Sequence, residues 1–118
     1  MDFWNRLQKL ISDNEIVIDR PKGSIHPKYK NFIMSLDYGF LKGTLSNDKN
    51  EIDVWKGSLD TCKLTGIVCT VDSMKKDSEI KLLIGCKEYE IDVLSDFYKF
   101  NKYMSGLIIK NSMNKNEN

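Results

Sequence analysis

The polar stretch SNDKNEIDVWKG, residues 46–57, gathers acidic side chains of a type that can bind a metal ion. Asp48 and Asp53 lie in this stretch with Glu51 close to the second, and the uncharged Asn50 lies between them. Carboxylates collected at a turn are ligands for a hard cation such as Mg²⁺, or they are simply solvated. Spacing alone favours the solvated turn, so a metal site needs support from other parts of the chain.

Further charged side chains fall where strands are expected to begin or end. Asp19 ends a first apolar run and Asp72 ends a later one, while Glu79 and Lys81 begin the next. Lys28 lies in a basic loop that follows the first run. In a small barrel these positions can converge on one rim, where carboxylates would hold Mg²⁺ and lysines would contact phosphate. The alternative is an ordinary solvated surface.

Two other residues are interpreted as structural on pattern alone. His26 is the only histidine, so it has no partner of its own kind for a metal site. Tyr38 lies in an expected strand, where a tyrosine is more typical of packing than of ligand binding.

The elements that must position these residues are predicted by apolar periodicity. Helical spacing predicts helices over 2–12 and 88–104, the second ended by Gly106, and apolar runs bounded by turns predict strands. The expected strands cover 15–19, 37–45, 51–59, 64–72 and 79–86, followed by a short strand over 107–110 and a flexible polar tail over 111–118. About five strands between two helices predict one mainly β (α+β) domain, residues 1–110, built on a small closed barrel.

Composition argues against several classes of protein. The chain of 118 residues has a net charge of +1, which does not favour nucleic acid or an anionic membrane as a partner. No stretch approaches the roughly 18 apolar residues of a membrane span. The three cysteines, Cys62, Cys69 and Cys86, lack the short spacing of a zinc site, and they suggest the reducing cytoplasm.

Several stretches, taken together and in order, resemble the soluble inorganic pyrophosphatase family. They are VIDRPKGSIHPKY, LDYGF, DKNEIDVW and a VD followed by EIKLL, all within residues 15–86. The resemblance implies an OB-like five-stranded β-barrel with an N-terminal and a C-terminal helix packed on it. It also implies hydrolysis of pyrophosphate to phosphate, Mg²⁺ as cofactor and a homo-oligomer.

The resemblance also assigns roles to individual residues. The implied metal ligands are Asp19, Asp48, Asp53, Asp72 and Glu79, with Asp77 as a rival to Glu79, and the implied substrate-binding residues are Lys28, Tyr38 and Lys81. Asp53 and Asn50 take the catalytic positions, Asn50 in place of the family's base.

The sequence departs from the family pattern at positions that matter for catalysis. Asn50 is no useful base near neutral pH, Lys30 replaces a glutamate, Met34 replaces a tyrosine, and the family's arginine has no counterpart. Glu51 or Asp37 is then the nearest substitute for the base. We therefore expect Mg²⁺-dependent pyrophosphate hydrolysis with reduced activity. The alternatives are a non-catalytic phosphate-, pyrophosphate- or nucleotide-binding barrel and an OB-like module for nucleic acid or a protein partner.

Overall fold

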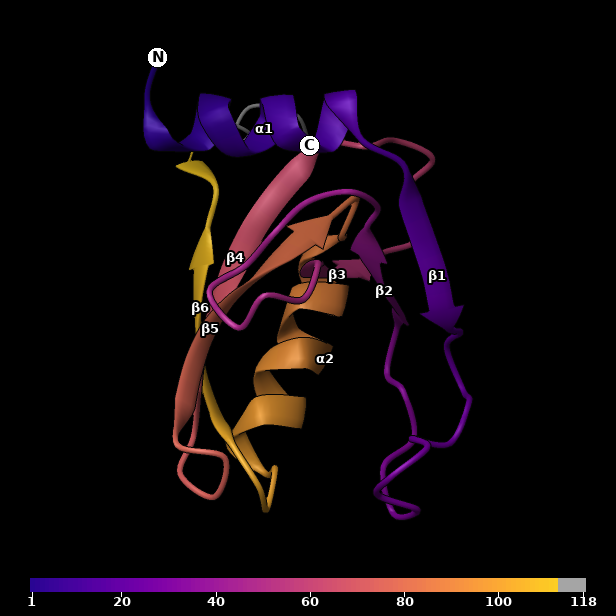
Figure 1. Cartoon of the computed structure of the whole chain (residues 1–118). Helices are drawn as coiled ribbons and strands as arrows, with labels where there is room; N and C mark the ends of the chain where they lie inside the picture. Colours follow the sequence, from indigo (N-terminus) through magenta and orange to yellow (C-terminus); the bar gives the residue numbers. More distant parts are fainter. Residues whose placement is uncertain (113–118) are drawn as a thin grey trace.

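The computed structural model describes residues 1–112, whose strands form one sheet flanked by two helices (Figure 1). The elements are α1 (Phe3–Asp13), β1 (Ile16–Arg20), β2 (Asp37–Leu41), β3 (Ile52–Lys56), β4 (Leu64–Asp72), β5 (Asp77–Ile84), α2 (Glu88–Lys99) and β6 (Ser105–Lys110). Each expected helix and strand therefore has a counterpart. Residues 113–118 of the expected tail lie outside the described residues. Neither α1 nor α2 is long and apolar enough to cross a membrane.

The sheet is open and has six strands in the order β1-β2-β3-β5-β4-β6. β2 and β3 pair as an antiparallel hairpin, and β4 and β5 form a second antiparallel pair. β3 and β5 are parallel neighbours over a short register that runs from Val54↔Leu82 to Lys56↔Ile84. The expected closed five-stranded barrel is not confirmed, because β6 adds a further strand beside β4 and leaves β1 and β6 at opposite edges of the sheet.

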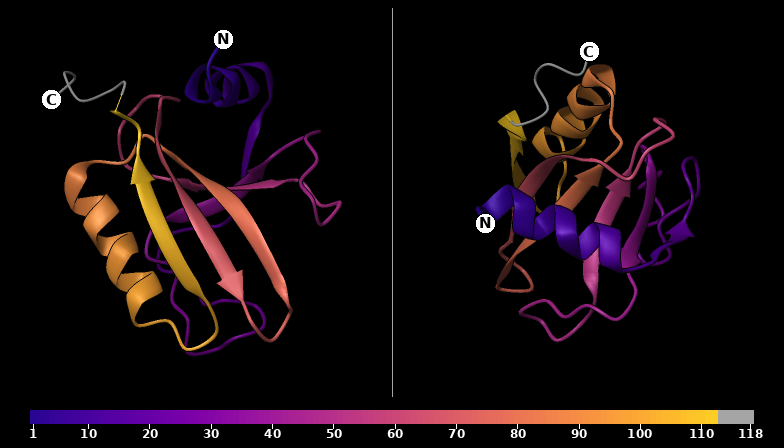
Figure 2. Two further views of the ribbon diagram at one scale, coloured as in Figure 1. Left: turned by 90° about the vertical axis from the view of Figure 1, so that its left-hand side faces the viewer. Right: turned by 90° about the horizontal axis from the view of Figure 1, so that it is seen from above.

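Alternation along the central strands produces two cores, one on each face of the sheet. Trp55 and Leu83 face α2 and pack with its Leu94. Their neighbours Val54 and Leu82 face the other way and belong to the core that α1 covers. Figure 2 shows the two helices on different sides of the sheet.

Three connecting segments meet at the end of the molecule away from α1 (Figures 1 and 2). They are the β1–β2 loop over 21–36, the β4–β5 turn over 73–76 and the α2–β6 turn over 100–104. All three segments contribute to one cavity, among other residues with His26, Lys75 and Asn101 respectively. Loops from distant parts of the chain therefore contribute to one site.

The helix α2 ends earlier than its apolar pattern predicts. It stops at Lys99 rather than near residue 104. Asn101 then turns the chain, because its Oδ1 accepts the backbone N–H groups of Tyr103 and Met104 at 2.8 and 3.1 Å. The prediction failed because Met104 packs against the core without being helical.

Gly106, which was expected to end this helix, lies instead within β6 opposite Thr70 of β4. A Cβ atom at this position would lie 2.6 Å from Cγ of Tyr98 in α2. Glycine is needed here because the helix passes so close to the strand.

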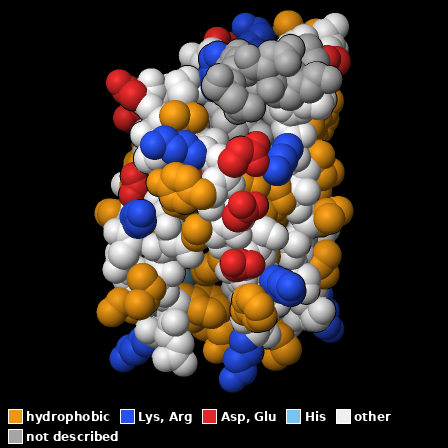
Figure 3. All heavy atoms as spheres, turned by 180° about the vertical axis from the view of Figure 1, so that it is seen from behind, with side chains coloured by type: hydrophobic (Ala, Val, Ile, Leu, Met, Phe, Trp, Pro, Cys, Tyr) orange, Lys and Arg blue, Asp and Glu red, His pale blue; other side chains and the backbone are white. Residues whose placement is uncertain are grey.

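Acidic and basic side chains are interspersed on the face shown in Figure 3, and apolar atoms reach the surface between them. A mixture of both signs is typical of an ordinary solvated surface. The residues with an unusual arrangement of charge lie in the cavity instead.

Candidate functional site

A cavity of about 520 Å³ is lined by the nine residues to which the resemblance assigned a role. These residues are Asp19, Lys28, Tyr38, Asp48, Asn50, Asp53, Asp72, Glu79 and Lys81. They come from β1 to β5, from the β1–β2 loop and from the β2–β3 loop. The fold thus brings to one place side chains that are spread over most of the chain.

Lys81 stands at the centre of the polar end of this cavity. Its Nζ lies 2.6 Å from the hydroxyl oxygen of Tyr38, 3.1 Å from Oδ2 of Asp53 and 3.5 Å from Oε2 of Glu79. Burial alone would lower the pKa of Lys81, but the neighbouring carboxylates, Asp53 foremost, raise it above its usual value. The side chain is therefore a fixed, charged ammonium group.

Tyr38 lies close to two cations. Its ring centroid is 5.4 Å from Arg20 Cζ and 5.2 Å from Lys81 Nζ. Burial, and then the charge and hydrogen bond of Asp53, raise the pKa of this phenol. Tyr38 is thus a neutral hydroxyl that accepts from the lysine and donates to the aspartate.

Asp48 and Glu79 form a close pair of carboxyl groups. Asp48 accepts hydrogen bonds from the Ser46 hydroxyl and the Asn50 backbone N–H, which lower its pKa to about 2. Burial, helped by Asp53 and Asp48, raises the pKa of Glu79. Glu79 is therefore the carboxyl group of the two that holds a proton more readily.

The carboxylates of this cavity are ligands of the type that Mg²⁺ takes. Among residues 1–112, no three histidine, cysteine, aspartate or glutamate side chains are arranged to hold one ion by themselves. Mg²⁺ commonly takes one or two carboxylates and completes its coordination with water and phosphate oxygens. Asp48 and Glu79, with Asp53 close by, meet that smaller requirement.

Asp72 and Asp19 line the cavity in different ways. Asp72 is buried, and its Oδ1 accepts the backbone N–H groups of Met74 and Lys75, both at 3.0 Å. One of its oxygens therefore holds the β4–β5 turn. Asp19 is exposed at the end of β1. Asp77, the rival of Glu79, pairs with Asp72 across the hairpin and is not part of the cavity wall, whereas Glu79 is.

Arg20 and His26 also line the cavity, and sequence reasoning assigned neither of them to the site. Nδ1 of His26 accepts the backbone N–H groups of Lys28 and Tyr29 at 3.0 and 3.1 Å. The hydrogen-bond network thereby assigns the ring proton to Nε2, which lies 3.1 Å from Nη1 of Arg20. Two donors face each other with no acceptor between them, which is an arrangement that an anion would relieve.

Electrostatics keep this histidine neutral. Burial, and then the charges of Arg20, Lys75, Lys28 and Lys81, lower the pKa of His26. A neutral ring leaves the cations of this wall available to an anionic ligand.

The signal for Arg20 was hidden by an irregularity in β1. Ile18 pairs with Gly39 and Arg20 with Tyr38, so the register shifts between the two β1 residues. Such a bulge changes the direction of a side chain. It allows the neighbours Asp19 and Arg20 both to line the cavity, which strict alternation would not predict.

Comparison with solved structures finds the same arrangement of elements elsewhere. An inorganic phosphatase from Anaplasma phagocytophilum matches with a TM-score of 0.55 at 16% identity, over 80% of this chain and 81% of that one. The inorganic pyrophosphatase of Helicobacter pylori matches with a TM-score of 0.53 at 13% identity, over 83% of this chain and 84% of that one. An inorganic pyrophosphatase of Coxiella burnetii matches with a TM-score of 0.56 at 13% identity, over 86% of this chain and 88% of that one. The chain has the fold of inorganic pyrophosphatases. No family model and no curated protein sequence matches it.

Within this pyrophosphatase fold, the position of the expected base is the weakest part of the site. Asn50 is exposed on the β2–β3 loop and donates its backbone N–H to Asp48 Oδ1 at 3.0 Å. The substitutes considered from sequence are engaged elsewhere. Glu51 accepts the Gly43 N–H at 2.8 Å, Asp37 accepts the Lys22 N–H at 2.8 Å, and neither lines the cavity.

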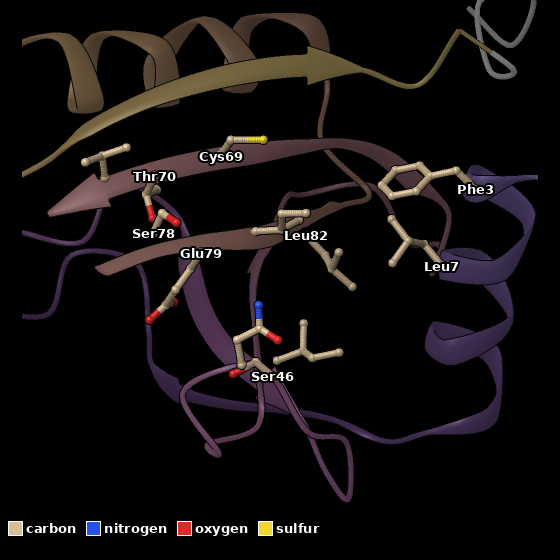
Figure 4. Close-up of a pocket in the computed structure, with 12 residues that line it drawn as sticks. Phe3, Leu7, Ser46, Cys69, Thr70, Ser78, Glu79 and Leu82 are labelled. Atoms are coloured by element: carbon tan, nitrogen blue, oxygen red, sulfur yellow. The ribbon is translucent and has the colours of Figure 1, made fainter. Parts of the chain in front are cut away.

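A second cavity of about 450 Å³ lies between α1 and the other face of the sheet (Figure 4). Phe3 and Leu7 of α1 and Leu82 of β5 line its apolar part. Among residues 1–112, Glu79 is the only acidic or basic side chain in its wall, and Figure 4 shows it at the end away from the helix. Its wall is mainly apolar, so the charged groups of the candidate site are gathered in the first cavity.

Proposed function

We propose that the protein binds Mg²⁺ and a diphosphate together and hydrolyses pyrophosphate to phosphate. The observation that carries this proposal is the single cavity that holds both carboxylates and cationic donors. The pyrophosphatase fold supports it as well. Phosphoryl transfer is accelerated chiefly by positioning and by neutralisation of charge, and these residue types do both.

The carboxylates would hold the cation. Asp48, Asp53 and Glu79 are the first candidates, and Asp19 and Asp72 provide further oxygens in the same wall. When bound, Mg²⁺ supplies positive charge for phosphate oxygens and makes a water molecule more acidic.

The cationic residues would bind the phosphate groups. Lys81 is held by Tyr38 and Asp53, so its charge is already positioned before a ligand arrives. Arg20, close to the Tyr38 ring, and the Nε2–H of His26 provide further donors, and Lys28 lines the same cavity. In this proposal Arg20 takes over the work of the arginine that the sequence pattern lacks.

We assign the role of proton acceptor to Glu79. A carboxylate is a better base when its pKa lies above the usual range, and burial and neighbouring carboxylates raise the pKa of Glu79. Asn50 lines the same cavity but has no ionisable group.

A second candidate is a protein that binds pyrophosphate without hydrolysing it. The specific observation in its favour is Asn50, which stands where the family has its base. In that case Asn50→Asp would gain hydrolysis in an otherwise complete site.

Phosphate release from pyrophosphate, measured with and without Mg²⁺, tests the proposal. Asp53→Asn and Glu79→Gln should each reduce Mg²⁺-dependent release by about 100-fold or more, as removal of a single stabilising group commonly does. Lys42→Met changes an exposed lysine outside the cavity and should have no effect. Tight pyrophosphate binding without any Mg²⁺-dependent release would favour the second candidate.

Homo-oligomeric assembly and a cytoplasmic location remain predictions of the sequence. Light scattering of the purified protein and microscopy of a tagged chain would test them.

A further inference from the structure

The proposed cavity continues beyond its charged groups to an aromatic end. Tyr29, Phe32 and Phe97 line this end, together with Met104 and Asn101. The whole cavity, about 520 Å³, lies in the range of roughly 300–1,000 Å³ that is typical of sites for drug-sized ligands. Inorganic diphosphate is much smaller than such a ligand and leaves the aromatic end unfilled.

The rings of the aromatic end pack on one another and stay partly exposed. Tyr29 is stacked on Tyr103 with the ring centroids 4.3 Å apart, and Phe32 meets Phe97 edge to face at 5.7 Å. These rings are all half-buried rather than fully covered. An aromatic wall of this kind is the surface on which a planar nucleobase stacks.

Asn101 supplies a hydrogen-bond donor that has no partner. Its Oδ1 accepts the N–H groups of Tyr103 and Met104, so the orientation of the amide is fixed by the turn. Its Nδ2 is buried and is the one buried side-chain polar atom without a partner among the described residues. A buried donor without an acceptor costs stability, and a ligand acceptor in this cavity would satisfy it.

We infer that this cavity binds a nucleoside diphosphate. The phosphates lie against Lys81 and Arg20, the base stacks on Tyr29 and Phe32, and an acceptor atom of the base takes the Nδ2–H of Asn101. The inference rests on the proposed function for the phosphate end and extends it by naming the group that the diphosphate carries. Hydrolysis would join the oxygen of water to the terminal phosphorus and break the bond from that phosphorus to the bridging oxygen. Nucleoside monophosphate, phosphate and a proton are released.

Calorimetry with Mg²⁺ and non-hydrolysable ligands tests the inference. The ligands are methylenediphosphonate, which has no base, and the α,β-methylene analogues of ADP, GDP and UDP. We expect at least one nucleotide analogue to bind about tenfold tighter than methylenediphosphonate, since stacking on an aromatic wall adds affinity.

Asn101→Asp separates the role of the donor from the role of the turn. The aspartate still accepts the two turn N–H groups but has no N–H to offer a base. Nucleotide affinity should fall about five- to tenfold, the effect of one lost hydrogen bond, while methylenediphosphonate binding stays constant. Asn31→Asp adds the same charge at an exposed position of the β1–β2 loop and is the matched control. Tyr29→Leu, with a similar expected loss, provides a second variant if Asn101→Asp fails to fold.

The outcomes distinguish the inference from the proposed function. Equal affinity for the nucleotide analogues and methylenediphosphonate would overturn the inference and leave the proposed function standing. Failure to bind either kind of ligand with Mg²⁺ would overturn both.

Discussion

Nζ of Lys81 lies 3.1 Å from Oδ2 of Asp53, across the short parallel pair formed by β3 and β5. The lysine is only 8% exposed, whereas the Asp53 side chain is 30% exposed, so water reaches the pair mainly from the aspartate side. A carboxylate in such a place needs a cation near it. Asp53 therefore has an internal partner, and any metal ion at this site competes with a lysine that is already present.

Replacing Lys81 should strengthen Mg²⁺ binding and slow the hydrolysis of pyrophosphate. In Lys81→Met, Asp53 and Glu79 lose their internal cation, so Mg²⁺ alone should bind more tightly by calorimetry. Pyrophosphate hydrolysis should fall by about 100-fold or more, because a positioned charge is removed. Lys42→Met serves as the control for loss of one lysine. Unchanged Mg²⁺ affinity in a folded Lys81→Met protein would contradict this account of the pair.

Arg20 should contribute to phosphate binding although no sequence motif marks it. Arg20→Gln keeps polar groups but removes the charge beside the Tyr38 ring. Affinity for methylenediphosphonate should fall about tenfold or more, as expected when one charged hydrogen bond is lost. Arg6→Gln removes an exposed arginine from α1 and should leave affinity unchanged. Equal affinity in the two variants would show that Arg20 has no part in binding.

His26 should make stability depend on pH. Its pKa is lowered in the folded protein by burial and by Arg20, Lys75, Lys28 and Lys81, whereas an unfolded histidine titrates near 6.5. Below about pH 6.5 the unfolded chain therefore binds more protons at this residue, and the free energy of unfolding falls as pH decreases.

His26→Asn keeps an acceptor for the two loop N–H groups and cannot titrate. Urea unfolding from pH 7.5 to 5.5 should show a loss of stability in the original protein that is smaller in this variant. If the free energy of unfolding depends on pH in the same way in the two proteins, then the pKa of His26 does not differ between the folded and the unfolded chain.

Gly106 should not tolerate a side chain. In Gly106→Ala the new methyl group would meet Cγ of Tyr98 at 2.6 Å, and this ring is held by a 2.8 Å hydrogen bond from the Trp55 indole. We expect a loss of about 1–3 kcal/mol in the free energy of unfolding, the usual cost of overpacking. Ser105→Ala, at the exposed neighbouring position, should change little in the same urea titration. Equal stabilities would indicate that α2 can move away from β6.

Much of the cavity wall could be predicted from sequence because regular strands place charged residues predictably. Alternation puts Asp53 on the face opposite Val54, and it puts Glu79 and Lys81 on one face of β5. Polar residues at strand ends then meet where the strands converge. The roles of these residues as ligands remain predictions, since their presence in one cavity does not establish what they bind.

The rest could not be predicted because it depends on departures from regularity. The bulge at Asp19 and Arg20 arises from the way β1 pairs with β2, and the sequence of β1 alone does not specify that pairing. The aromatic end depends on Asn101 stopping a helix whose apolar spacing continues to Met104. The open sheet depends on where β6 docks, and a short apolar run does not specify its neighbour.

The short register between β3 and β5 is the hydrogen-bonded seam between two halves of the sheet, β1-β2-β3 and β5-β4-β6. Asp53 belongs to one half, and Glu79 and Lys81 belong to the other. A ligand that touches both halves would hold them together across the shortest strand pairing of the sheet. Amide hydrogens of Val54 to Lys56 should therefore report occupancy of the cavity by exchanging more slowly.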